Sequence, residues 1–288
     1  MEQSLLAEEL ERAEGLMVQG ETELAHDMLA KLAEDAEEYV DKNCATTKDQ
    51  QYFSFPTAFD YLAYVRVEQD PRTLFDVGEP LDRLYEDLAH TEVMLDNREG
   101  AMAALKQAVR WNPMDCASRL NLAELYRADG DINEFLALTY SVFERASETS
   151  HLVRAYLNFS RWFLAGKHDR QAAACLHAAQ SLEGENPELV EECERARDTN
   201  HDPRTLSKAE AEQLLEDEGL PYGANAEIAI CLLGCGLDAA HAGDRASATT
   251  YIVRARDLVG EEIAEMLLQA LKDADDDLSA ETGAESRA

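Results

Sequence analysis

The sequence predicts an all-α fold. Over long stretches, apolar residues recur at the three- and four-residue spacing of amphipathic helices, and alternation of period two is almost absent. Only 14 Gly and 7 Pro occur among 288 residues, so few positions interrupt a helix. Hydrophobic residues make up 45% of the chain, which is enough to build a core and excludes general disorder.

The composition is strongly acidic, with 59 Asp and Glu against 26 Lys and Arg and a formal net charge of -33. Such a surface repels phosphate backbones and anionic lipid headgroups. The densest basic clusters are pairs such as Arg254 and Arg256. The charge therefore excludes nucleic-acid and membrane-surface partners. The excess of Arg over Lys fits either a salt-adapted cytoplasm or a GC-rich genome, and the sequence does not separate the two.

Three features predict a cytoplasmic location. The six cysteines lie in apolar, helix-like contexts without a disulfide framework, which indicates reduced thiols. The first residues lack the basic region of a signal peptide. The longest nearly uncharged apolar run, Ile228 to Leu237, is too short to cross a bilayer.

Composition and turn residues divide the chain into six expected segments. They are an N-terminal helical hairpin (1–40), an aromatic-rich helical connection (41–81), a core of three related hairpins (82–187), polar helices with a linker (188–226), a C-terminal hairpin with a capping helix (227–271), and an acidic tail expected to be disordered (272–288).

The hairpins of the core have a regular length. Residues 82–115 read as two helices that turn near Asp96 and stop at Pro113, and residues 116–149 read as two helices that turn at Gly130. Ala89 and Ala123 stand 34 positions apart. Small side chains at such positions let paired helices approach closely, while larger apolar side chains fill the gaps.

This pattern resembles the tetratricopeptide repeat, a 34-residue helical hairpin. With Asp82 as position 1, the first unit matches at Leu88, Ala89, Ala101, Leu105, Ala108 and Pro113. The second matches at Leu122, Ala123, Tyr126, Gly130 and Val142 and departs at Phe135 and Ser147. Further units turn at Gly20, Gly166 and Gly243. The resemblance implies a right-handed superhelix, or α-solenoid, of such hairpins; an irregular helical bundle is the alternative.

Two segments interrupt the hairpins. Residues 41–81 hold an aromatic cluster: Tyr52, Phe53, Phe55, Phe59, Tyr61 and Tyr64. We expect it to fill a gap next to the first hairpin, although exposed aromatic side chains would instead mark a partner site. Pro56 is expected to open a helix there. In residues 188–226, Ser207 and Glu210 predict a capping box.

Signatures of catalysis are absent from the sequence. It lacks phosphate-binding glycine loops, metalloprotease motifs and nucleophile elbows, and its Cys and His residues have no recognised zinc spacing. Cys231 and Cys235 fall on one helix face, where small core residues are a better interpretation than half of a metal site. We therefore expect no catalytic residues, no bound metal and no cofactor.

In tetratricopeptide proteins the partner usually binds along the first helices, at positions 2, 5, 9 and 12. The resemblance transfers these positions to Arg83, Glu86, His90 and Val93, to Ala117, Leu120, Glu124 and Arg127, and to Val153, Tyr156, Ser160 and Phe163. Asn121 matches an asparagine of the clamp by which some members grip chaperone tails. Glu86 stands where that clamp needs lysine, so a chaperone-tail adaptor is not expected.

The expected function is a non-enzymatic scaffold or adaptor that binds a peptide or protein partner, with a basic or polar surface, in this groove. Three alternatives stay open. Linking segments of the chain itself fill the groove; the protein is a helical regulator or sensor that binds a small ligand or metal between repeats; or it is an enzyme on a helical scaffold.

Overall fold

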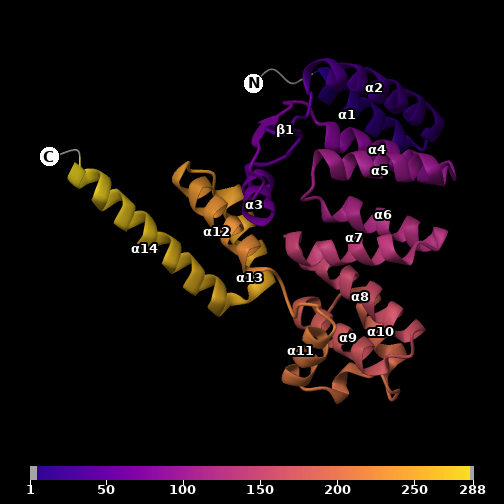
Figure 1. The fold of residues 1–288 in the computed structure, drawn as a ribbon, viewed down its shortest axis with the longest axis vertical. Helices are drawn as coiled ribbons and strands as arrows, with labels where there is room; N and C mark the ends of the chain where they lie inside the picture. The colour runs from indigo at the N-terminus through magenta and orange to yellow at the C-terminus, as the bar shows by residue number, and fades with distance from the viewer. Residues whose placement is uncertain (1–4, 286–288) are drawn as a thin grey trace. The chain divides into compact units, whose positions relative to one another are not determined.

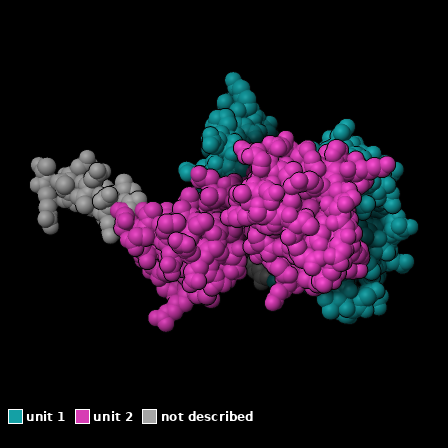
Figure 2. Space-filling view, turned by 90° about the horizontal axis from the view of Figure 1, so that it is seen from below, with its two compact units in different colours: residues 1–139 teal, residues 140–288 magenta. Residues whose placement is uncertain are grey.

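The structure is a computed structural model and describes residues 5–285. It confirms the helical class: the described residues form fourteen α-helices, one 3-10 helix and two short strands. The chain divides within one helix into two compact units, residues 1–139 and 140–288, which Figure 2 colours separately. None of the helices in the described residues combines the length and apolar character of a membrane span.

The first unit consists of helical hairpins with a small insert between the first and the second (Figure 1). Its elements are α1 (Leu5–Gln19), α2 (Thr22–Asn43), β1 (Gln50–Phe53), α3 (Ala58–Glu68), β2 (Thr73–Asp76), α4 (Leu81–Met94), α5 (Arg98–Trp111), α6 (Cys116–Asp129) and α7 (Ile132–Arg145), which continues into the second unit.

Helices of the first unit pack in chain order. The α1–α2 and α4–α5 pairs form hairpins, and α2 packs on α4 as α5 packs on α6. Leu10, Leu29, Leu84 and Trp111 are buried in one core cluster that joins α1, α2, α4 and α5. The small side chain of Ala123 is fully buried, as the close helix approach requires.

Two parallel strands correct the expectation of an exclusively helical insert. β1 pairs with β2 in a register that joins Gln50 to Thr73 and Phe53 to Asp76. Each strand has four residues. A period of two cannot be recognised over so short a run, because a few apolar residues fit a helix equally well.

The helix of the insert begins at Ala58, two residues later than Pro56 suggests. Thr57 is the N-cap of this helix, because its side chain accepts a hydrogen bond from the backbone N–H of Asp60. Some side chains of the aromatic cluster are buried and others are exposed to solvent. Phe53, Phe59 and Tyr64 are buried, whereas Tyr61 is 44% exposed. The packing interpretation therefore holds for part of the cluster only.

The second unit begins at Tyr140 in the last part of α7. Its further elements are α8 (Thr149–Ala165), α9 (Asp169–Glu183), α10 (Pro187–Ala196), the 3-10 helix η1 (Pro203–Thr205), α11 (Lys208–Asp217), α12 (Ala226–His241), α13 (Arg245–Val259) and α14 (Glu261–Glu285).

Two groups of helices make up the second unit. In the first group α8, α10 and α11 pack against α9; in the second, α12, α13 and α14 pack against one another. A Cβ atom on Gly236 would stand 3.0 Å from the Ile252 side chain, so α12 and α13 approach closely at a position where only glycine fits well. Arg254 on α13 donates to the backbone oxygen of Ser147 (3.2 Å), which joins the second group to the start of the unit.

Helix ends in this unit follow local signals. Ser207 and Glu210 form the predicted capping box of α11. The segment expected to be a disordered tail, 272–288, overlaps α14, which continues as a helix to Glu285. Residues 286–288 lie outside the described part of the chain.

Candidate partner-binding groove

The first helices of the first unit lie side by side. The Arg83 guanidinium on α4 donates to the carboxylate of Glu14 on α1. The Ser118 hydroxyl on α6 donates to Glu86 Oε1 on α4 (3.3 Å). These side chains define a continuous face, here called the α1–α4–α6 face.

Most of the predicted groove residues of this unit lie at or near the surface. His90, Asn121 and Arg127 are exposed, and Glu124 is half-buried and accepts a hydrogen bond from Arg127 Nε (2.8 Å). Leu120 is an exception because it is fully buried in the core. It therefore cannot contact a partner, and its inclusion in the groove was wrong.

Glu86 is a carboxylic acid whose pKa lies above its ordinary value. Burial raises the pKa of Glu86, and hydrogen bonding to Asp115 and the charges of Asp115 and Asp82 raise it further. Asp115 is held in place as the N-cap of α6, where it accepts the backbone N–H groups of Ala117 (2.8 Å) and Ser118 (3.1 Å). Two carboxyl groups of adjacent hairpins thus share one site.

Asp87 forms a second carboxyl pair, with Glu14 of α1. Burial and the Glu14 carboxylate raise the pKa of Asp87 to about 7, although Arg83 acts in the opposite direction. The α1–α4–α6 face therefore presents two carboxyl pairs, Glu86 with Asp115 and Asp87 with Glu14, and Arg83 is ion-paired with Glu14 of the second pair. Such a face is suited to receive a positively charged side chain.

Four predicted groove residues, Val153 among them, fall in the second unit, and all of them are buried. Tyr156, Ser160 and Phe163 on α8 are at most 3% exposed. The Ser160 hydroxyl donates to the backbone oxygen of Ala172 on α9 (3.2 Å), so it is occupied inside the hairpin. These side chains belong to the core, and their assignment to an open groove was wrong.

The loop between α11 and α12 covers Tyr156. The tyrosine hydroxyl accepts the backbone N–H of Gly223 (2.8 Å) and donates to the backbone oxygen of Pro221 (2.9 Å). Burial raises the pKa of Tyr156, so the hydroxyl keeps its proton and can donate. Around α8, a linking segment of the chain thus occupies the place expected for a partner.

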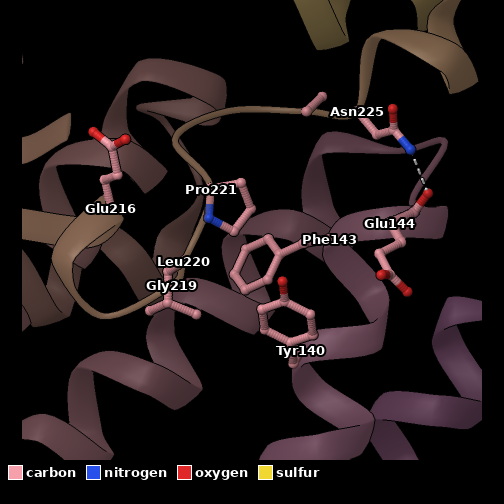
Figure 3. A pocket seen from close by; sticks show the side chains of 9 residues that line it. Tyr140, Phe143, Glu144, Glu216, Gly219, Leu220, Pro221 and Asn225 are labelled. Carbon is pink, nitrogen blue, oxygen red and sulfur yellow. Dashed lines mark hydrogen bonds between the residues drawn. The ribbon is translucent and has the colours of Figure 1, made fainter. Parts of the chain in front are cut away.

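A pocket of about 460 Å³ stays open beside this loop (Figure 3). Phe143 and Tyr140 of α7 lie beneath Pro221, and the Asn225 side chain donates to the backbone oxygen of Glu144 (2.8 Å). The pocket is lined by Tyr140, Phe143, Glu144, Glu216, Gly219, Leu220, Pro221, Ala224 and Asn225. Its aromatic walls and two carboxylates suit a small cationic or amphipathic group.

Sequence reasoning missed this pocket because its walls come from distant segments. Gly219 and Pro221 are turn-forming residues, and they predict the end of a helix rather than a binding site.

The cysteine thiols Cys175 and Cys193 differ in burial, since Cys175 lies in the core and Cys193 is half-buried. Cys175 is fully buried, and burial raises the pKa of its thiol; burial also raises the pKa of Cys193 to about 11. Neither is an activated nucleophile, since the thiolate is the reactive form. Among the described residues, no group of three or more His, Cys, Asp or Glu side chains is arranged to hold a metal ion.

No protein-family model matches the sequence, and no curated protein matches it.

Proposed function

We propose that this protein is a non-enzymatic interaction scaffold built from tetratricopeptide-like helical hairpins that stack as an α-solenoid. The partner is a basic segment of another protein, bound along the α1–α4–α6 face of the first unit. The observation that carries this proposal is the lateral contact of successive first helices, with Arg83 bonded to Glu14 and Ser118 bonded to Glu86.

The packing order supports a stacked array. In such an array each second helix also packs on the first helix of the next hairpin, which buries a continuous core between units. Here α2 packs on α4 and α5 packs on α6. His26 of α2 contacts Glu92 of α4 (3.1 Å), and Arg98 of α5 pairs with Asp129 of α6 (2.8 Å).

The charge of the face supports a basic partner. Helix α1 contains four acidic side chains and one basic side chain. Opposite charges across an interface speed association and orient the partner, and this effect weakens as salt increases. An acidic partner would bring further negative charge to the carboxyl groups of the Glu86–Asp115 and Asp87–Glu14 pairs.

Photo-crosslinking in the native cell tests the proposal. The photoreactive residue p-benzoylphenylalanine replaces His90, which is exposed on α4. We expect an adduct with a partner whose crosslinked segment is basic, and we expect its yield to decrease at high salt.

The matched control replaces Ala103, which is exposed on the second helix α5. Equal labelling from both positions, or an adduct whose segment is acidic, would contradict binding on the α1–α4–α6 face. Absence of any adduct at His90 would remove the support for a scaffold role of this face.

The pocket beside the α11–α12 loop favours a second candidate, a regulatory or sensor role in which a small cationic ligand binds the second unit. Ligands that bind the folded state raise the melting temperature. A thermal-shift screen with polyamines and amino-acid amides tests it, and Glu216→Gln should abolish any shift that depends on this pocket. A shift that persists in Glu216→Gln places the ligand elsewhere.

A further inference from the structure

We infer that the outer edge of β2 binds an extended, positively charged segment of a partner protein as a third strand of the small sheet. The site belongs to the insert between α2 and α4. It is independent of the α1–α4–α6 face, because its contacts are to the backbone of β2 and to the pocket beside it.

Backbone geometry leaves this edge unpaired. The N–H groups of Thr73 and Val77 donate to the oxygens of Asp49 and Phe53 on the β1 side, each at 2.9 Å. Because alternate residues of a strand direct their backbone groups to opposite sides, Leu74 and Asp76 point theirs away from β1. In residues 5–285 neither of these two amides has a hydrogen-bond partner, and the sheet ends at β2.

The opposite edge of the sheet is closed. The N–H of Ser54 donates to the backbone oxygen of Trp111 (3.0 Å), and the Arg110 guanidinium donates to the backbone oxygen of Tyr52 (2.9 Å). The Ser54 hydroxyl also bonds to Asp82 of α4 (2.9 Å). The end of α5 and the start of α4 therefore fix β1, so β2 presents its free edge from an anchored sheet.

Three residues of β2 also line a pocket of about 550 Å³. It is lined by Phe55, Pro56, Thr57, Ala58, Tyr61, Leu74, Phe75 and Asp76. The side chains of Leu74 and Asp76 share one face of the strand, while Phe75 lies on the other face and stacks on Tyr52 with 5.3 Å between ring centroids. An added strand would thus meet Leu74 and Asp76 on one face and the Tyr52–Phe75 aromatic pair on the other.

Register and charge define the occupant. Residues directly opposite each other on neighbouring strands interact. The residue opposite Leu74 should therefore be apolar, the one opposite Phe75 β-branched or aromatic, and the one opposite Asp76 Lys or Arg. Residues 51–80 hold five acidic and two basic side chains, and Arg72 is paired with Asp70 (2.6 Å).

A second copy of this chain is disfavoured at the same edge. Self-pairing would bring two β2 strands together with their Asp76 carboxylates, between molecules that each carry a formal net charge of -33. Like charges on adjacent edge strands oppose such pairing and are a common protection against aggregation. The same aspartate that repels a copy attracts a basic strand.

The probe is the fluorescein-labelled heptapeptide Ser-Thr-Leu-Val-Lys-Thr-Ser. As a strand parallel to β2, it places its leucine opposite Leu74, its valine opposite Phe75 and its lysine opposite Asp76. Binding to the full chain is followed by fluorescence anisotropy. Replacing its lysine by glutamate should weaken binding about ten-fold, because an attractive cross-strand pair becomes a repulsive one. Methylating its backbone nitrogens one at a time should weaken binding at alternate residues only, since one edge of a strand faces β2.

Variants of the protein test the same contact from the other side. Leu74→Pro removes an outward N–H and should abolish peptide binding, whereas Leu74→Ala keeps that N–H and should retain part of it. If Leu74→Pro disturbs the fold of the insert, the N-methylated peptides still test the contact, because they are measured with the unchanged protein.

Three outcomes would overturn the inference. They are equal affinity for the lysine and glutamate peptides, insensitivity to every N-methylation, and no binding up to millimolar peptide. A dimer in sedimentation that Leu74→Pro dissociates would assign the edge to a second copy instead. None of these outcomes bears on crosslinking at His90, so failure here is distinguishable from failure of the proposed function.

Discussion

Substitution of Glu86 by glutamine should stabilise the first unit in a strongly pH-dependent way. Glutamine matches glutamate in shape, can accept the Ser118 hydroxyl, and can donate to Asp115 as the protonated acid does. Glutamine differs from glutamate in one respect: it is neutral at every pH, whereas glutamate must bind a proton to be neutral in this half-buried site.

The magnitude follows from the pKa of Glu86, which is raised in the folded state above its ordinary value of 4.5. Above that value the unfolded chain loses the proton while the folded chain keeps it. The free energy of unfolding therefore falls by about 1.4 kcal/mol for each pH unit until the pKa of the folded state is reached. At pH 7 the accumulated cost is about 3 kcal/mol, so Glu86→Gln should gain up to this amount at pH 7 and almost nothing at pH 4.

Urea unfolding at pH 4, 5.5 and 7 measures this gain. The chain has two tryptophans, Trp111 in the first unit and Trp162 in the second. In a Trp162→Phe background the fluorescence reports the first unit alone through Trp111, which is 3% exposed. With this background, unfolding of the first unit is measured separately from unfolding of the second unit, so the two are not analysed as a single transition.

Glu37→Gln serves as the control, because Glu37 is an exposed glutamate in the middle of α2. It should change the free energy of unfolding by less than about 0.5 kcal/mol. If the curves of Glu86→Gln and its parent stay parallel between pH 4 and 7, Glu86 is ionised in the folded state and the reasoning about the shared carboxyl site fails.

Three further predictions concern packing and capping. Ala123→Trp should lower the free energy of unfolding by about 1 to 3 kcal/mol through overpacking, measured by circular dichroism in urea, while the exposed Ala103→Trp should not. An unaltered midpoint for Ala123→Trp would mean that the helices of this hairpin do not meet there. Tyr156→Phe leaves the N–H of Gly223 without its partner and should cost about 1 to 3 kcal/mol. Faster hydrogen exchange of that amide checks it, and unchanged exchange would show that the loop is held by other contacts. Ser207→Ala should destabilise α11 by about 0.5 to 2 kcal/mol, seen as faster exchange in its first turn, and Ser207→Thr should restore it.

Local patterns in the sequence predicted what local contacts determine. The helices follow from apolar residues three and four positions apart, because a helix brings such neighbours onto one face. The related hairpins follow from small residues at equivalent positions, such as Ala89 and Ala123, which stand 34 positions apart. The capping box of α11 is equally local, because its two side chains are three residues apart.

Contacts between distant segments could not be predicted in this way. The partner of Gln50 is Thr73, in a strand too short to show its period. Tyr156 seemed available for a partner because the loop that covers it lies 65 residues further along the chain. The sharing of one site by Glu86 and Asp115 likewise depends on how two hairpins stack.

The protonated acids of the α1–α4–α6 face give the chain an adjustable charge. The formal value of -33 counts every carboxyl group as ionised, whereas the raised pKa values of Glu86 and Asp87 favour their protonated forms near neutral pH. A cationic side chain placed beside them would lower both pKa values and expel those protons into the buffer. The heat of such an association would then vary with the ionisation enthalpy of the buffer, and its affinity would increase with pH. A groove of fully ionised carboxylates would show neither effect.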